Sequence, residues 1–198
     1  MPFHVIIGDR QVDDAAVLSD HPAAVEEESF RFDEGVPLAS WFPKEAVYPM
    51  DREFPDLRVL HDLQVNTLGL LVASKAFRAV LEAGAHGNLE FLPITIRDHR
   101  RKIASKDHFI VNVLHPVDCV DRKRSTLVMS AIDPTQAISI ENPVLREDQI
   151  PADVDLFRLA VRTSVFVVRD ELKARIESAG LRGMELIPIA EYDSAIHE

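Results

Sequence analysis

Two carboxylates and a hydroxyl form the most suggestive set of polar side chains in the sequence. Asp118, Asp121 and Ser125 lie three and four residues apart, at the end of an apolar stretch. Carboxylates at such spacing could bind a cation or take part in acid–base catalysis. Aspartate and serine at a strand end more often accept hydrogen bonds from nearby backbone N–H groups and fix a turn. We favour the turn, with an enzyme or small-molecule-binding protein that uses Asp118 and Asp121 as the alternative.

Other patterns of catalysis and metal binding are missing from the sequence. No two of the eight histidines have the i, i+4 spacing of a helical metal site. The sequence also has no glycine-rich phosphate loop, dinucleotide-binding fingerprint or Gly-x-Ser-x-Gly elbow. The single cysteine, Cys119, lies in an apolar run, so we interpret it as a buried hydrophobe and not as a nucleophile. We therefore predict no catalytic residue, metal ligand or cofactor site.

Length and composition are those of a soluble globular protein. The chain has 198 residues, of which 46% are hydrophobic and 28% charged, and this size suits one domain. No apolar run approaches the roughly 18 residues of a membrane helix, and the first ten residues do not have the pattern of a signal peptide. We expect a single cytoplasmic domain over residues 1–198, without a membrane partner.

Negative charge is concentrated in the first third of the chain. The net charge is −11, and residues 1–66 hold 14 acidic and 5 basic residues. Proteins that bind nucleic acid present basic surfaces, so this composition argues against a nucleic-acid partner. An acidic surface can instead steer a basic protein partner, although acidity can also serve solubility alone.

The elements that must position these side chains follow from the apolar pattern. Residues 70–72 indicate a buried strand, and Ser74 can cap a following helix. Apolar positions then recur on one helical face, and Gly84 and Gly87 mark the helix end. Residues 89–94 and 109–113 indicate two further strands. The apolar face consists of Phe77, Val80, Leu81 and Gly84.

A weak copy of this pattern occurs near the C-terminus. At a shift of 95 positions, residues 71–94 align with residues 166–189 and share six identical pairs, Pro93/Pro188 among them. In the copy, Asp170 can cap the helix. We predict an α+β fold with mixed or antiparallel sheets and two similar strand–helix–strand units, at about 68–96 and 164–190, within the sections 67–132 and 133–198. The alternative is that the likeness reflects only the apolar pattern that such units share.

The N-terminal section has fewer regular signals. Residues 3–8 alternate as a strand does, and Phe30-Arg31-Phe32 is a plausible second strand. Residues 35–55 contain four prolines, so we expect an irregular segment laid over the surface. Its aromatic residues should pin it to the body of the protein, with an exposed aromatic binding patch as the alternative. These aromatics are Trp41, Phe42, Tyr48 and Phe54.

Several further segments complete the expected fold. Residues 127–132 and 138–140 predict two paired strands, and residues 155–159 predict a strand before the second unit. The polar tail from Tyr192 is expected to fray. Two basic clusters, Arg97–Lys106 and Arg122–Arg124, follow successive strands and should therefore lie at opposite ends of a meander.

Short motifs follow one another in a fixed order along the sequence. They are a Gly-x-Pro segment, a Val-x-Ser-x-x-Phe helix start, a Glu-Phe-x-Pro strand, an Asn-bearing strand, an Asp-x-x-Asp-x-x-x-Ser turn and a late Phe-Arg pair. The residues that carry them are Gly35 and Pro37; Val72, Ser74 and Phe77; Glu90, Phe91 and Pro93; Asn112; Asp118, Asp121 and Ser125; and Phe157 and Arg158. In this order they resemble the bacterial immunity protein family eleven, over about residues 30–189. His108 stands where the family has a tyrosine.

The resemblance implies an α+β protein, encoded beside a toxin, that binds and neutralises the toxin without catalysis. From the charge distribution, we expect acidic residues of the first 66 positions to face a basic surface of that toxin. The leading candidates are Glu26, Glu27, Glu28, Asp33 and Glu34. Asn112, Asp118, Asp121 and Ser125 are interpreted as structural motif residues. A scaffold or self-assembling module is a further alternative, and a homodimer remains open.

Overall fold

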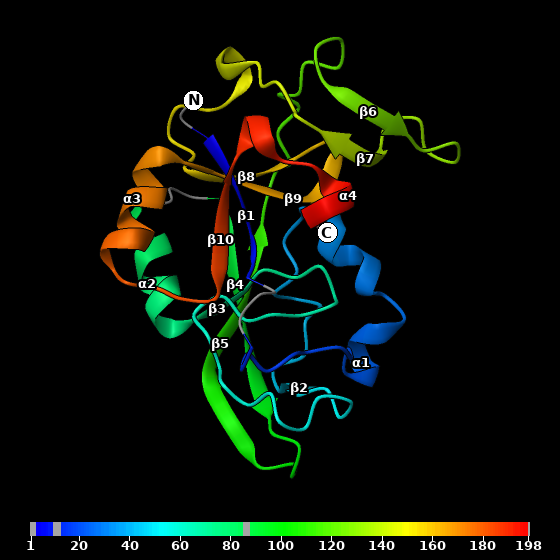
Figure 1. The fold of residues 1–198 in the computed structure, drawn as a ribbon. Coiled ribbons are helices and arrows are strands. Elements are labelled where there is room, and N and C mark those ends of the chain that lie inside the picture. Colours follow the sequence, from blue (N-terminus) through cyan, green and yellow to red (C-terminus); the bar gives the residue numbers. More distant parts are fainter. Residues whose placement is uncertain (1–2, 10–12, 85–87, 198) are drawn as a thin grey trace.

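The computed structural model describes residues 3–9, 13–84 and 88–197, whose strands form three sheets (Figure 1). The first has the order β10-β1-β9-β8, with β1 (Phe3–Gly8), β8 (Leu156–Leu159), β9 (Arg162–Arg169) and β10 (Met184–Pro188). The second has the order β2-β4-β5-β3, with β2 (Ala46–Pro49), β3 (Val72–Ser74), β4 (Leu89–Arg97) and β5 (Ile103–Val113). The third pairs β6 (Thr126–Met129) with β7 (Ala137–Glu141).

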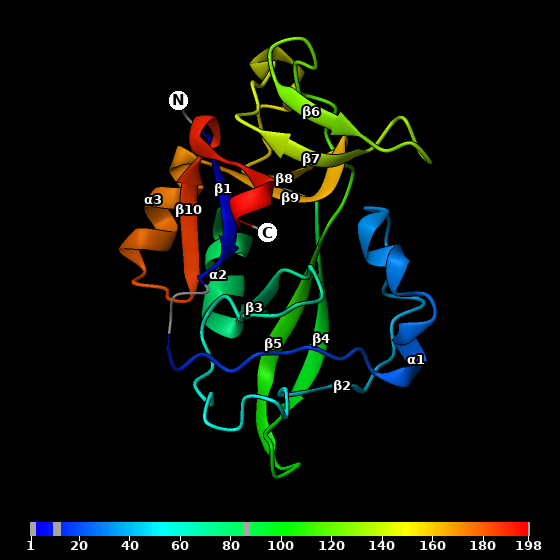
Figure 2. The same ribbon diagram turned by 45° about the vertical axis from the view of Figure 1, so that its right-hand side comes forward.

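The helices are short. The α-helices are α1 (Ala23–Glu26), α2 (Lys75–Gly84), α3 (Asp170–Ser178) and α4 (Ser194–His197), and the 3₁₀ helices are η1 (Ser29–Asp33), η2 (Glu147–Gln149) and η3 (Ile189–Glu191). In both ribbon views α2 and α3 lie side by side, whereas α1 is on the opposite side (Figures 1 and 2). Among the residues described, no helix combines the length and apolar character needed to cross a bilayer.

The predicted α+β class and the two similar units are confirmed. In the first unit, β3 and β4 flank α2 in sequence, and both pair antiparallel with β5, which lies between them. In the second unit, β9 and β10 flank α3 and pair antiparallel with β1 in the same way. Each unit is therefore a strand–helix–strand crossover with one antiparallel strand inserted between its two strands.

Helix α2 begins and packs as its sequence predicts. The Ser74 hydroxyl accepts the Phe77 N–H at 3.1 Å and donates to the Asp62 carboxylate at 2.7 Å. Phe77 and Leu81 are fully buried, because they lie on the helical face that meets the core between the sheets. The helix ends at Gly84, and Gly87, the other predicted end marker, is outside the described residues.

The predicted cap of α3 is wrong by one residue. Strand β9 continues to Arg169, which occupies the N-cap position with an extended backbone, so Asp170 is the first helical residue. Its carboxylate lies 3.2 Å from His4 Nδ1 on the neighbouring strand. A carboxylate in the first turn still interacts favourably with the N–H groups exposed at the helix start.

The predicted strand at Phe30–Phe32 is a 3₁₀ helix, η1. Phe32 is 5% exposed and Phe30 is 59% exposed, although the two would share a face in a strand. Glu28 and Arg31 form an ion pair of 2.5 Å at the i, i+3 spacing that a helical turn allows. The alternation of aromatic and polar residues here imitates a strand without forming one.

The proline-rich segment 35–55 is only partly the expected surface layer. It contains β2, which pairs parallel with β4 at the edge of the second sheet, and an edge strand tolerates proline. Phe42 and Tyr48 are buried in the core beside this sheet, and Trp41 packs against it. Phe54 is 46% exposed and does not pin the segment.

The C-terminal tail does not fray as expected. Tyr192 is fully buried, and its carbonyl accepts the Asn142 N–H at 2.7 Å. The Ser194 hydroxyl accepts the Ile140 N–H at 3.0 Å. The backbone edge of β7 therefore offers the tail partners that the polar sequence alone does not reveal.

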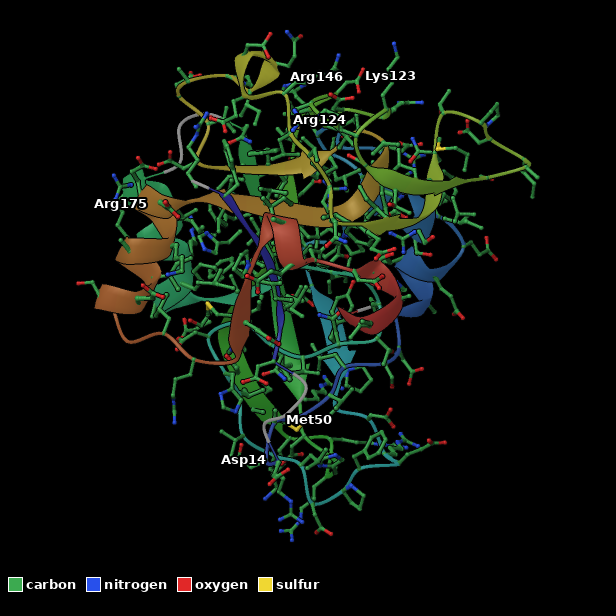
Figure 3. All side chains as sticks on the ribbon, turned by 45° about the horizontal axis from the view of Figure 1, so that its top comes forward. Asp14, Met50, Lys123, Arg124, Arg146 and Arg175 are labelled. Carbon is green, nitrogen blue, oxygen red and sulfur yellow. The ribbon has the colours of Figure 1, made fainter. Side chains whose placement is uncertain are left out.

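The two basic clusters lie at opposite ends of the molecule, as the order of the strands predicts. The first surrounds the β4–β5 turn, where the Met50 N–H donates to the Arg97 carbonyl at 2.8 Å. Lys123 and Arg124 of the second cluster lie at the far end from Met50 (Figure 3). They therefore do not form one basic patch.

Candidate functional site

Asp121 and Ser125 take part in a hydrogen-bonded turn. Asp121 Oδ1 accepts the Lys123 N–H at 3.0 Å, and the Asp121 carbonyl accepts the Ser125 N–H at 3.0 Å. The Ser125 hydroxyl accepts the Val144 N–H at 2.8 Å. Asp118 is exposed and lies 3.6 Å from the Arg146 guanidinium. Asp121 and Ser125 thus hold a turn, and Asp118 lies beside an arginine.

Cys119 is shielded from solvent, and no metal-binding cluster is found among the residues described. Cys119 is fully buried, and burial raises the pKa of its thiol to about 12. Within the described ranges, no group of three or more His, Cys, Asp or Glu residues could hold a metal ion.

His108 is a buried imidazole on β5, an inner strand of the second sheet, where it is paired with both β3 and β4. Its Nε2 lies 3.3 Å from the His61 carbonyl and its Nδ1 lies 2.8 Å from the Ser105 hydroxyl. Because a carbonyl only accepts, Nε2 carries the proton and Nδ1 accepts from Ser105. Burial lowers the pKa of His108, and nearby Asp62 and Asp107 oppose that shift. A neutral, structural imidazole thus occupies the position where a tyrosine was expected.

Glu90 and Asn112 bind the backbone of a surface segment. Glu90 Oε2 accepts the Leu38 N–H at 2.7 Å, and Oε1 accepts the Ala39 N–H at 2.9 Å. Asn112 Nδ2 donates to the Val36 carbonyl at 2.8 Å and to Glu90 Oε2 at 3.0 Å. Two neighbouring strands, β4 and β5, thereby hold the backbone of Val36, Leu38 and Ala39, shortly after η1.

Arg158 binds the same surface segment from the first sheet. Its Nη1 donates to the Phe32 carbonyl at 2.6 Å, and its guanidinium lies 4.9 Å from the centre of the Phe166 ring. The side chain is 3% exposed. Burial lowers the pKa of Arg158 to about 10, and the charge of Asp33 opposes this shift. Arg158 remains a cation at neutral pH.

Gly35 fixes the turn between these two contacts. It has a φ of +65°, a conformation that residues with a Cβ rarely adopt. A Cβ added here would lie 2.5 Å from Cδ of Pro116. The Gly35 carbonyl accepts the His115 N–H at 2.9 Å. We call residues 29–39 the clamped segment, and Glu90, Asn112 and Arg158 the clamp.

Aromatic stacking adds to the hold on the clamped segment. The Phe32 ring is stacked with His21 at a centroid distance of 5.8 Å and meets Trp41 edge-on at 5.7 Å. The Arg31 guanidinium lies 5.3 Å from the Trp41 ring centre. The backbone and one face of the segment are therefore fixed against the protein, while its other face meets solvent.

The predicted acidic residues lie on and next to the clamped segment. Glu28 is half-buried and paired with Arg31, and the other four candidates are exposed. The outward face also carries Phe30 and Val36, which are 59% and 43% exposed. Figures 1 and 2 place α1 on the side away from α2 and α3. The exposed candidates are Glu26, Glu27, Asp33 and Glu34.

A pocket of about 220 Å³ lies elsewhere, between β1, residues 63–71 and β9. Its lining is apolar or uncharged, with Ile6, Leu70 and Phe166 among its walls. None of the lining residues identified is titratable, and neither Asp118 nor Asp121 belongs to it. The pocket therefore offers no acid–base chemistry to the enzyme alternative.

Sequence reasoning did not identify Glu90 and Arg158 as parts of one site. Both were noted only as motif residues, and one local signal was available. Arg158 interrupts the otherwise apolar strand Leu156–Leu159, and a charge in a fully buried strand needs a specific partner. The partner of Arg158 is the carbonyl of Phe32, which lies 126 residues earlier in the chain, and no local pattern identifies a partner that distant.

The chain matches the model of a known protein family. The model of the Immunity protein family (Imm11) matches residues 7–191, nearly the whole chain. The match includes the clamped segment and all three clamp residues. Among curated proteins, none matches the chain.

Proposed function

Because the chain belongs to the Immunity protein family (Imm11), we propose that it protects its host by binding and neutralising a bacterial toxin, without catalysing a reaction. The observation that carries the proposal is a group of exposed carboxylates on and beside the clamped segment, whose backbone is hydrogen-bonded by Glu90 and by the buried side chains of Asn112 and Arg158. The partner is the toxin encoded beside this gene, and the contact surface on that toxin is basic.

The charge of the region supports a basic partner. Residues 1–66 hold a net charge of −9. Glu34 is exposed on the clamped segment, and Glu26 and Glu27 are exposed just before it in the sequence. Complementary charge raises the rate at which two proteins meet, and salt weakens the effect. A stable complex would bury about 800 Å² on each partner.

Charge reversal tests the proposed contact. The triple variant Glu26→Lys, Glu27→Lys and Glu34→Lys should reduce the association rate with the purified neighbouring toxin by at least about tenfold. The reduction should be largest at an ionic strength of about 0.01 M, where charges act over about 30 Å. Surface plasmon resonance or stopped-flow fluorescence measures this rate.

A control variant separates local from overall charge. Glu147→Lys, Asp148→Lys and Asp153→Lys change the net charge equally, and all three residues are exposed outside the clamped segment. This variant should keep an association rate within about threefold of wild type. Equal rates for both triple variants would place the contact elsewhere. Failure of the wild-type protein to restore growth of cells that express the toxin would contradict the immunity function itself.

A further inference from the structure

We infer that Glu90, Asn112 and Arg158 are positioning residues that present Phe30 and Val36 as the apolar centre of the toxin interface. The inference rests on the proposed function and names the chemistry of the partner. The toxin surface that fits carries an apolar recess with Lys or Arg side chains around its rim. Phe30 enters the recess, and the exposed carboxylates on and beside the clamped segment meet the rim.

The first argument comes from what the clamp binds. All three side chains direct hydrogen bonds to the backbone of the clamped segment, at the Phe32 carbonyl, the Val36 carbonyl and the amides of Leu38 and Ala39. Asn112 and Arg158 are 1% and 3% exposed. Three polar groups, from strands of both four-stranded sheets, thus act on one short surface stretch.

The second argument is that stability by itself does not explain such a clamp. Well-packed apolar side chains often stabilise a core as much as a buried polar or charged group. Among the residues described, Asn112 Oδ1 and Arg158 Nε also have no hydrogen-bond partner, which is unfavourable for buried atoms. What the clamp does provide is a single backbone conformation for residues 29–39, and pre-organisation of this kind strengthens binding.

The third argument concerns the outward face that the clamp presents. Nine large hydrophobic residues are exposed in the described chain, and Phe30 and Val36 are the two of them that lie on the clamped segment. Exposed aromatic side chains that become buried at the centre of an interface supply a large share of its binding energy. The surrounding carboxylates would form the polar rim that excludes water from such a centre.

One set of variants tests the anchor residues. Phe30→Ala and Val36→Ala change exposed side chains, so both variants should fold normally. Each should raise the dissociation rate from the purified neighbouring toxin by at least about tenfold, and leave the association rate within about twofold of wild type. Phe54→Ala is the matched control, since Phe54 is 46% exposed and lies outside the clamped segment. Its dissociation rate should equal that of wild type.

A second set tests the clamp. Arg158→Met and Asn112→Leu replace polar clamp residues by apolar side chains of similar size. Hydrogen–deuterium exchange should become at least about tenfold faster over residues 29–39 and stay unchanged over the strands of the second sheet. The dissociation rate from the toxin should rise by at least about tenfold.

Asn88→Leu is the control for a general effect on stability. Asn88 is 7% exposed, donates to the Leu156 carbonyl at 2.8 Å and has an unpartnered Oδ1, but it does not bind the clamped segment. The Asn88→Leu variant should dissociate from the toxin at the wild-type rate. An equal rise in Asn88→Leu and Asn112→Leu would overturn the positioning role.

The outcomes separate this inference from the proposed function. A wild-type protein that binds the toxin, with Phe30→Ala and Val36→Ala both equal to wild type, overturns the inference and leaves immunity intact. A wild-type protein that neither binds nor protects overturns both. Faster dissociation in both variant sets, with unchanged controls, supports the inference.

Discussion

Glu90 holds more backbone groups of the clamped segment than any other clamp residue, and its removal should measurably destabilise the protein. Its carboxylate accepts the Leu38 N–H at 2.7 Å, the Ala39 N–H at 2.9 Å and Asn112 Nδ2 at 3.0 Å. Hydrogen bonds to charged groups contribute about 1.5–3 kcal/mol each. The bonds from Leu38 and Asn112 are partly buried, whereas the bond from Ala39 is exposed and weaker.

From these contacts, we expect Glu90→Ala to lower the free energy of unfolding by about 3 kcal/mol. For a protein of this size, that loss lowers the Tm by about 6–12 °C. Glu90→Gln keeps one carbonyl acceptor and loses the charge, so it should lower the free energy of unfolding by about half as much as Glu90→Ala. Urea unfolding gives the free energies, and differential scanning calorimetry gives the Tm values.

Glu82→Ala is the matched control for removing a glutamate. Glu82 forms an exposed ion pair with Arg78, at 2.7 Å within α2, and such pairs contribute less than about 1 kcal/mol. If Glu90→Ala costs no more than Glu82→Ala, the carboxylate does not hold the segment and the reasoning about the clamp is refuted.

Three further predictions concern other parts of the protein. Gly35→Ala should cost at least about 1 kcal/mol more than Gly180→Ala in urea unfolding, because both have positive φ but only the Gly35 methyl would meet Pro116. Burial lowers the pKa of His108, so its contribution to stability is present above about pH 6.5 and is lost as the pH falls through the lowered pKa. Compared with wild type, His108→Gln should therefore lose less stability between about pH 7 and pH 5. Cys119 should react with a thiol reagent only after global unfolding, since its thiol is fully buried and its pKa is raised to about 12, and rapid labelling of the native protein would contradict this.

Local patterns in the sequence predicted much of the fold. The apolar face of α2 and the Ser74 cap depend on residues within about one helical turn of each other, so periodicity and capping rules apply directly. The likeness between the two units likewise corresponds to the same strand–helix–strand path in both. These features share short-range causes that a single sequence contains.

Long-range contacts decided the places where prediction failed. Phe30–Phe32 has the sequence pattern of a strand. In the structure, however, the Phe32 carbonyl accepts from Arg158, 126 residues later in the chain, and the Phe32 ring packs on His21. The tail from Tyr192 looks disordered by composition, yet the edge of β7 gives it backbone partners. No local rule identifies which distant strand will supply such a partner.

The candidate site was predictable in part for the same reason. Charge alone pointed to the acidic stretch around Glu26–Glu34, and most of the acidic side chains in that stretch are exposed. That Glu90 and Arg158 both bind the clamped segment, which overlaps this stretch, follows only from the three-dimensional structure. Sequence motifs marked these residues without indicating what they touch.

Hydrogen–deuterium exchange of the protein with and without the neighbouring toxin tests the proposed contact most directly. Binding should slow exchange of the amides at residues 26–39, with the largest change close to Phe30. If exchange slows instead at the β4–β5 turn or in β6 and β7, while residues 26–39 are unchanged, then residues 26–39 are not the surface that meets the toxin.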